Sequence, residues 1–526
     1  MVSLLDKVKF LCIAGVGLFS DGFLNLTIGL VVPMLGYLYW QDQGGDVPTA
    51  QSDIMKGTLN VGMAVGQLMF GVLGDALGRH KVYGKELLIT LFGTLMVVLL
   101  PWNNFDKQSI VAWVACFRVV TGIGIGADYP ISSSLTAEST PLGSRAVLSL
   151  SVFACMGLGN IAASITFLVL VEAFQSGIES DIKYVEWVWR LLFGLGMIPA
   201  AITLYARWTM AETAPYEKCM SRSYQDAPMR ESNFLDVLKE TNTEKVDKRG
   251  LKEQFRDFAV YFSEWKHAKA LFATSASWFL FDIAYYGVNL NQSVILKEIG
   301  YADGPTPWVT LRNTAVGNII VQVAGYLPGY FCGIPLPDLV GRTHQQFYSC
   351  IIVAILYAVW AGITNYTSLF LNMGPDCTTW LMPVEVFPTS VRGTAHGISA
   401  AAGKFGAILT AFAFGTVTDR IGLPGVLGLF SGVMVLNALV TFWIPETRGM
   451  TITDIENEVH FAQHRPMDIF KWPGLWRKER EEGVTDDNVA GKSESVTPHR
   501  GGSYQGRLCL RKNGLSRSMR TFDTQV

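Results

Sequence analysis

Charged residues are scarce in this chain of 526 residues, and they occupy only 16% of its positions. A soluble globular protein uses about 25%, so the composition argues against a water-soluble domain and indicates a membrane protein. The formal net charge is only −2. This small charge gives no indication of a nucleic-acid partner, and we expect none.

Cysteine is uncommon as well, with eight residues in the chain. Six of them fall in or beside apolar segments without the spacing of metal ligands, and we interpret them as small buried hydrophobic residues: Cys12, Cys116, Cys155, Cys332, Cys350 and Cys377. We therefore expect no disulfide framework, metal or cofactor. Because no nucleophile–base pairing and no soluble catalytic domain can be recognised, the chain is not expected to be an enzyme.

Apolar runs are abundant instead. Segments of about 20 residues, long enough to cross a bilayer, recur at 9–35, 57–78, 85–102, 110–136, 146–172, 187–210, 269–297, 313–337, 345–364, 366–389, 394–418 and 423–445. The pattern predicts an all-α membrane protein with twelve transmembrane helices in two groups of six. The first segment contains Asp21 and no small-residue cleavage site, so we interpret it as a membrane helix rather than a signal peptide.

Charge patterning divides the chain into four parts. We predict an N-terminal six-helix bundle at 1–211, a charged linker with room for an amphipathic helix at 212–268, a C-terminal six-helix bundle at 269–446 and a disordered tail at 447–526. Short loops with Lys and Arg alternate with the stretch 41–53, which has no basic residue. By the positive-inside rule, the basic loops, the linker and both termini are expected to be cytoplasmic.

The two groups of helices repeat the same polar motifs in the same order. An Asp-x-x-Gly-Arg motif, a Glu-x-x-Pro-x-x-x-Arg motif and a Glu-Thr pair occur once in each group, and these supply Asp75, Arg79, Glu138, Arg145 and Glu212 in the first and Asp338, Arg342, Glu385, Arg392 and Glu446 in the second. Such repetition indicates two homologous halves. We predict that eight of these ten residues, all except Glu212 and Glu446, act as a cytoplasmic gate. An ordinary positive-inside loop would explain the charge but not the repetition.

One apolar segment carries an acid that is costly to keep in a membrane. On a helix, Trp278, Asp282 and Tyr286 are four residues apart and share one face, so a carboxyl lies between an indole N–H and a phenol O–H. We predict a polar binding surface here. The alternative is a buried Asp that a neighbouring helix satisfies. We expect this face to lie near the start of the second half, opposite Asp128 of the first.

Three stretches together resemble the phosphate:proton symporter family of fungi and plants, within the major facilitator superfamily. They are Gly122-Ile-Gly-Ile-Gly-Ala-Asp-Tyr-Pro130 followed by Glu138, the segment 278–293, and 374–388 running on to 396–404. The glycines at 122, 124 and 126 lie inside an apolar segment with no preceding strand, so we expect them to allow close helix packing rather than to hold a nucleotide. The resemblance covers nearly all of 9–447.

This resemblance implies import of inorganic phosphate with protons across a plasma membrane, through a site midway between two bundles. Tyr129, Trp278, Asp282 and Tyr286 match phosphate-contacting positions, and Asp21 and Asp128 match carboxylates assigned to proton movement. Lys404 matches a basic position of the eleventh helix. Its ammonium either neutralises one of the acids or snorkels from a helix end.

The chain departs from that family at three positions. Leu24 stands where a second acid of helix one is usual, Met156 replaces a phosphate-binding Gln, and Asp376 replaces an Asn. Met156 and Asp376 are nevertheless counted among the substrate-lining positions. Of the predictions made here, these departures count most against selectivity for phosphate. An organophosphate such as a glycerophosphodiester is therefore an alternative cargo.

Charge arithmetic favours an anion coupled to protons. A monovalent anion entering against an inside-negative potential needs at least two protons, because each net charge is worth about 2.3 kcal/mol per 100 mV. Protonated Asp282 would donate a hydrogen bond to the anion, whereas the ionised form repels it. A third hypothesis, from another class, is a phosphate-sensing receptor that signals through the tail.

Overall fold

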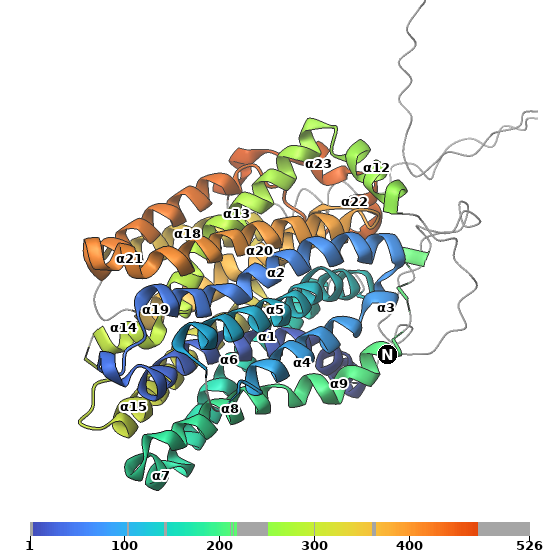
Figure 1. The fold of residues 1–526 in the computed structure, drawn as a ribbon. Coiled ribbons are helices and arrows are strands. Elements are labelled where there is room, and N and C mark those ends of the chain that lie inside the picture. Colours follow the sequence, from blue (N-terminus) through green and yellow to red (C-terminus); the bar gives the residue numbers. More distant parts are fainter. Residues whose placement is uncertain are drawn as a thin grey trace, which may run out of the picture.

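The computed structural model describes residues 4–101, 105–140, 145–210, 212–213, 215–217, 251–298, 300–359 and 364–471. Within these ranges the regular secondary structure is helical (Figure 1). Helices satisfy their own backbone hydrogen bonds, which lipid cannot do. Most of the predicted linker and the tail beyond 471 lie outside the described residues, so the prediction of a receptor with a signalling tail stays a prediction.

The first six predicted segments each correspond to helix. They are α1 (Leu4–Tyr39), α2 (Thr49–Leu77), α4 (Lys85–Val98), α5 (Lys107–Glu138), α6 (Arg145–Ala173) and the consecutive pair α8 (Val185–Gly196) and α9 (Ile198–Trp208). Short connecting helices are η1 (Gln41–Gln43), α3 (Arg79–Val82), α7 (Gln175–Ser180) and η2 (Ile182–Tyr184).

The second six segments are more broken. They form α13 (Trp265–Asn289); α15 (Pro307–Val321), η4 (Gln322–Tyr326) and α16 (Leu327–Gly333); α18 (Arg342–Val359); α19 (Thr364–Leu371), η5 (Asn372–Asp376) and α20 (Cys377–Val386); and α21 (Arg392–Thr441). The connectors α14 (Gln292–Glu298) and α17 (Leu336–Val340) lie between them. The last two predicted segments both fall largely within α21, which changes direction at Gly422, where φ is +70°.

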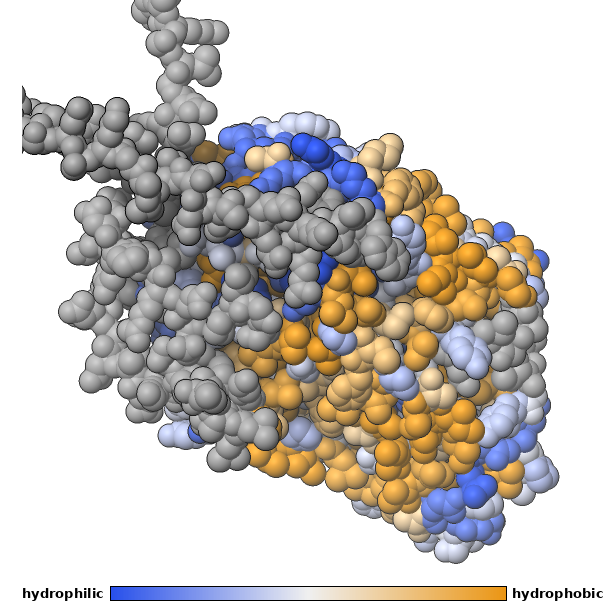
Figure 2. Space-filling view, turned by 180° about the vertical axis from the view of Figure 1, so that it is seen from behind, coloured by the Kyte–Doolittle hydropathy of each residue, from blue (hydrophilic) through white to orange (hydrophobic). Residues whose placement is uncertain are grey.

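Seven helical stretches in the described part of the chain are long and apolar enough to cross a membrane. Figure 2 shows apolar residues over the middle of one face and hydrophilic residues gathered toward its ends. Large apolar side chains are exposed on many helices, including Val169, Ile202, Phe272, Ile355 and Leu409. An apolar surface of this kind is suited to lipid.

Close packing of α2 joins the two halves. This helix packs extensively against α5 of its own half and against α21 of the other. A Cβ on Gly122 of α5 would lie 2.1 Å from the Leu59 carbonyl oxygen, and one on Gly397 of α21 would lie 2.4 Å from that of Gln67. The prediction that the glycines of 122–126 serve helix packing is confirmed.

The prediction of a disordered tail from residue 447 is wrong for its first part. Residues 452–470 form α22 (Ile452–Glu456), α23 (Val459–Gln463) and η6 (Pro466–Phe470), with Ile455 and Ile469 buried. A capping box at Thr451 and Asp454 starts α22. In the linker, α12 (Leu251–Tyr261) is the described amphipathic helix. The polar composition of 447–471 concealed these few apolar anchors.

Candidate functional site

An ion pair between α13 and α21 lies at the centre of the site. The ammonium Nζ of Lys404 is 3.0 Å from Oδ2 of Asp282 and donates a hydrogen bond of 2.7 Å to the hydroxyl of Tyr286. Trp278 donates a further hydrogen bond to Asp282. Lys404 is only 2% exposed. Of the two interpretations of this lysine, neutralisation of an acid is therefore the one that the structure supports.

The first half completes the site from the opposite side. Tyr129 of α5 donates a hydrogen bond to Asp21 of α1, and Asn25 also donates to that carboxylate. The Tyr129 ring lies 6.3 Å from the Trp278 ring and 5.4 Å from Nζ of Lys404. The lysine is thus held between the phenol rings of Tyr129 and Tyr286, which is a favourable position for a cation.

A small cavity separates these groups. It is lined by Tyr129, Phe153, Met156, Trp278, Phe281, Asp282, Tyr285, Tyr286, Asp376 and Lys404. The tertiary structure therefore brings all the predicted substrate-binding residues into contact with one cavity. Phe153, Phe281 and Tyr285 were not predicted, because an aromatic residue inside an apolar segment carries no signal that separates a site wall from ordinary packing.

The two departures from the family pattern both lie at this cavity. Sδ of Met156 is 3.9 Å from the Tyr129 hydroxyl, at the edge of a weak hydrogen bond. Asp376 ends the π-helical turn η5, a kind of turn that is frequent at functional sites. One oxygen of Asp376 bonds to Tyr330, whereas Oδ2 has no hydrogen-bond partner among the described residues.

Asp128 is not part of the cavity. Its carboxylate accepts hydrogen bonds from Arg207 of α9 and from Ser132, and Arg207 also lies 3.1 Å from Glu86. The expectation that Asp282 faces Asp128 is therefore wrong. Neighbouring helical residues point about 100° apart, so Tyr129 faces the cavity while Asp128 turns toward α1 and α9.

Arg118 and Arg207 are two of the buried arginines that the sequence-based predictions missed. Arg207 joins Asp128 and Glu86, and Arg118 of α5 reaches the Leu24 carbonyl oxygen at 3.5 Å while its Nε and Nη2 make no hydrogen bond within the described part of the chain. The signal was available, because each arginine interrupts an apolar segment. A charge at such a position indicates a partner or a role.

A second polar cluster closes one end of the bundle between the two halves, and we call it the latch: Asp75, Arg79, Glu138, Thr389, Arg392, Gly393 and Thr394. Asp75 accepts hydrogen bonds from the backbone N–H groups of Gly393 and Thr394, at 3.1 and 2.7 Å. Arg79 donates to the Thr389 carbonyl at 3.0 Å, and Arg392 lies 3.2 Å from Glu138.

The motif repeat is visible as repeated geometry. Arg79 pairs with Asp75 and Glu138, each at 3.0 Å, and Arg342 pairs with Asp338 and Glu385 at 3.0 and 2.7 Å. In the Glu-Thr pairs, Thr213 donates to Glu138 and Thr447 donates to Glu385. Arg145 reaches the Met450 carbonyl at 3.5 Å. Seven of the eight predicted gating residues therefore lie in these two related clusters, and the charge of the eighth, Arg145, acts on Glu385 of the second.

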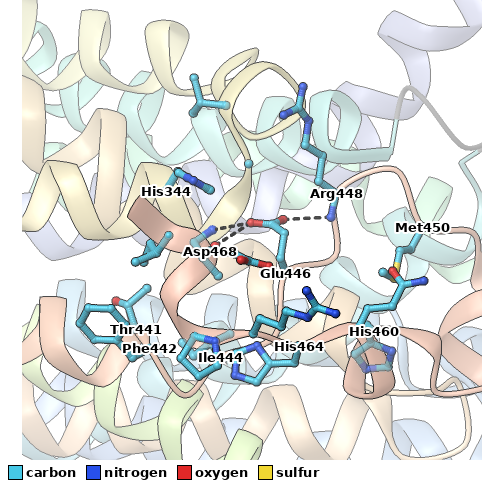
Figure 3. A pocket seen from close by; sticks show the side chains of 17 residues that line it. His344, Thr441, Phe442, Ile444, Glu446, Arg448, Met450, His460, His464 and Asp468 are labelled. Carbon is cyan, nitrogen blue, oxygen red and sulfur yellow. Dashed lines mark hydrogen bonds between the residues drawn. The ribbon is translucent and has the colours of Figure 1, made fainter. Parts of the chain in front are cut away.

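A larger cavity lies beside the cluster of Asp338, Arg342 and Glu385, between the ends of α18 and α21 and the segment 459–470 (Figure 3). Glu446 projects into it, and His344, His460 and His464 are among its lining residues. His344 bonds to the Lys471 carbonyl and His460 to the Val386 carbonyl, at 3.0 and 2.9 Å. These bonds fasten the segment after α21 to the helix ends.

Comparison with known proteins supports one family. The family described as sugar (and other) transporter matches residues 10–459. The inorganic phosphate transporter PHO84 of Saccharomyces cerevisiae is 36% identical, over 86% of this chain and 85% of its own length. The repressible high-affinity phosphate permease of Neurospora crassa is 33% identical, and the match covers 86% of each chain.

Among solved structures, the proton:xylose symporter XylE bound to a bromodeoxyglucose superimposes with a TM-score of 0.64. The match covers 86% of this chain and 98% of XylE, at 17% identity. An inward-open structure of XylE from E. coli gives a TM-score of 0.59 over 86% and 99% of the two chains, also at 17% identity. At 17% identity the likeness shows a shared fold and gives no information about the cargo.

Proposed function

The chain belongs to the sugar (and other) transporter family, and we propose that it imports inorganic phosphate together with protons by alternating access. It is a multi-pass membrane transporter and not an enzyme. The fold predicted from the sequence, an all-α protein of the major facilitator type, is confirmed by the match to XylE. Phosphate as cargo is supported by the names of relatives in two fungi.

The Asp282–Lys404 pair is the observation that carries the proposal of proton coupling. An ionised Asp282 cancels the charge of Lys404 at 3.0 Å, so the pair offers no net charge to an anion. A proton on Asp282 would free the ammonium, and the carboxyl would become a hydrogen-bond donor. Phosphate and a proton would then enter the site together and leave it together.

The other acids strengthen this argument. Asp21 and Asp376 lie around the same lysine, so the site holds three carboxyl groups and one ammonium. With every carboxyl ionised the site would repel phosphate, and each proton taken up removes part of that repulsion. We therefore assign Asp21, Asp282 and Asp376 to proton uptake. Asp128 acts in this proposal through Arg207, as a support for the helices that hold Tyr129.

The latch would be the gate on the cytoplasmic side. The basic loops around Arg79, Arg145, Arg342 and Arg392 are cytoplasmic by the positive-inside rule, and both termini would lie on that side. The latch would break when the halves rock apart to release phosphate and re-form when the site faces outward. In this proposal the rocking units are the bundles 1–211 and 269–446, and the plasma membrane is the site of uptake.

Uptake by reconstituted vesicles tests the proposal. Purified protein in proteoliposomes should accumulate labelled phosphate several-fold when the outside is more acidic than the inside by about two pH units, and a protonophore should abolish the accumulation. Protein-free vesicles are the control. Equal uptake with and without the pH gradient would exclude coupling to protons, and no uptake in either condition would exclude phosphate as the cargo.

An organophosphate is the second candidate cargo, because Met156 and Asp376 line the cavity at the two positions where the chain departs from the family pattern. Neither side chain is an amide, and Asp376 Oδ2 has no hydrogen-bond partner within the described ranges. A glycerophosphodiester carries hydroxyl groups that could donate to this oxygen, whereas a phosphate oxygen would need Asp376 to be protonated. Competition of labelled phosphate uptake by excess glycerophosphodiester separates the two cargoes.

Replacing Met156 by Gln should favour phosphate over the diester. The amide would stand where Sδ lies 3.9 Å from the Tyr129 hydroxyl and would donate a hydrogen bond to the anion. A hydrogen bond to a charged group is worth about 1.5–3 kcal/mol, so the KM for phosphate should fall roughly 10-fold. The conservative variant Met156→Leu, which fills the same space without a donor, should leave the KM unchanged. An equal fall in both variants would refute a hydrogen-bonding role.

A further inference from the structure

The junction between α12, α13 and α23 contains a histidine with two glutamates around it. Glu264 precedes α13, His267 lies in its first turn and Glu458 precedes α23. One potential ligand atom from each residue lies within 4.8 Å of the others. His267 and Asp282 lie on the same helix α13 but 15 residues apart, which places them about 22 Å apart along the helix axis.

The histidine is oriented as a metal ligand usually is. Nδ1 of His267 lies 2.8 Å from the Tyr261 carbonyl oxygen, which can only accept, so Nδ1 carries the proton. In the neutral ring Nε2 then presents a lone pair, and this tautomer is the one that second-shell carbonyls select in metal sites. The Tyr261 ring stacks on the imidazole at 3.9 Å with an interplanar angle of 4°, which holds the ring in place.

The lone pair of His267 is directed at a carboxylate. Nε2 lies 3.2 Å from Oε1 of Glu458, and His267 is only 1% exposed. A lone pair facing a carboxylate oxygen is repulsive unless a cation lies between them. Two ligands of one tetrahedral zinc ion, each about 2.0–2.1 Å from the metal, are about 3.3 Å apart, close to the observed separation.

A cation already lies beside these acids. The ammonium of Lys266 is 2.5 Å from Oε2 of Glu458 and 3.2 Å from Oε2 of Glu264. This ammonium marks where positive charge is favourable and would compete with a metal ion. The side chains of Lys266 and Glu264 are 45% and 62% exposed, so they can move aside or close inward without repacking the core.

We propose that His267 Nε2 and the carboxylates of Glu264 and Glu458 form a binding site for a divalent transition-metal ion of the zinc type. Imidazole nitrogen with carboxylate oxygen suits such ions better than magnesium or calcium. Water would complete the coordination on the exposed side. The bound ion would tie α23 to the start of α13, and so would fasten the segment 452–470 to the second half.

Zinc titration of the purified full-length protein in detergent tests the site directly. Competition with a chromophoric chelator should show one zinc ion bound per chain at pH 7.5, and cobalt should give the intense visible absorption of a tetrahedral ion. Glu458→Gln should weaken zinc binding at least about 10-fold, and Lys266→Gln should strengthen it several-fold because the competing ammonium is removed.

Matched variants separate the cluster from adventitious binding. His464→Gln alters a nearby histidine that, among the described residues, belongs to no such group of ligands, so zinc affinity should be unchanged. Amide exchange of 452–463 should slow on adding zinc in wild type but not in Glu458→Gln. Thermal unfolding of each metal-free variant should match wild type and so exclude misfolding.

Three results would overturn the proposal. They are no stoichiometric zinc binding by wild type, unchanged binding in Glu458→Gln, and equal loss of binding in Glu458→Gln and His464→Gln. If zinc does not bind, the contact of His267 with Glu458 is an imidazolium ion pair instead.

Discussion

Replacing Asp282 by Asn is expected to reduce proton-driven phosphate uptake to below about 1% of wild type. The substitution leaves the buried ammonium of Lys404 without its carboxylate, and breaking a buried pair costs about 3–5 kcal/mol, which is roughly a 150-fold to 5,000-fold effect. It also removes a proton acceptor. Initial rates of labelled phosphate uptake into proteoliposomes, measured from pH 5 to pH 8, provide the measurement.

Exchange of phosphate across the membrane separates coupling from binding. Asn has the shape of a protonated Asp and can donate a hydrogen bond. The rate of phosphate–phosphate exchange without net proton movement should therefore stay within about 10-fold of the wild-type rate. Asp128→Asn is the comparison, because it removes a partner of Arg207 and should instead lower the melting temperature. Wild-type uptake with wild-type pH dependence in Asp282→Asn would refute the role assigned to Asp282.

Replacing Asp75 by Asn is expected to open the latch. The carboxylate accepts from two backbone N–H groups and the Thr394 hydroxyl of the other half, and pairs with Arg79. An amide has one acceptor oxygen and would turn its NH₂ toward donors. The loss of about 3–5 kcal/mol should shift the population at least 100-fold toward the state that is open at this end. Spin labels at Lys81 and Ser390 should report a longer distance.

The second half offers a matched control at the equivalent motif position. Asp338 pairs with Arg342 within its own half, four residues along the chain, and its side chain is 33% exposed. Asp338→Asn should therefore cost only about 1 kcal/mol or less and should leave the distance between Lys81 and Ser390 unchanged. If both variants open the bundle equally, the motif acts within each half and the latch does not hold the halves together.

The repeated motifs predicted the gating clusters well, because each motif is local. Asp75 and Arg79 are four residues apart and need only one helical turn to meet, and Asp338 and Arg342 repeat that spacing. The sequence could not indicate that Asp75 also holds Gly393 and Thr394. That contact joins residues more than 300 positions apart, and it depends on how α2 packs against α21.

The site residues were predicted in part by periodicity and in part by resemblance. Trp278, Asp282 and Tyr286 share a helical face and do line one cavity. Asp128 and Tyr129 are adjacent in the sequence, and the resemblance implied that both take part in transport, Tyr129 by contacting phosphate and Asp128 by moving protons. A single step along the helix sends Asp128 to Arg207 instead, and only the packing of α9 against α1 reveals that partner.

The acid at 282, set in an apolar run, was enough to indicate a functional helix, since a lone carboxylate in a membrane is too costly to keep without a use. Composition and segment length were likewise enough for the all-α membrane fold, because both follow from the demands of lipid. The tertiary structure alone decided which cation Asp282 meets. Lys404 lies 122 residues further along the chain, and the packing of α13 against α21 brings the two charges to 3.0 Å.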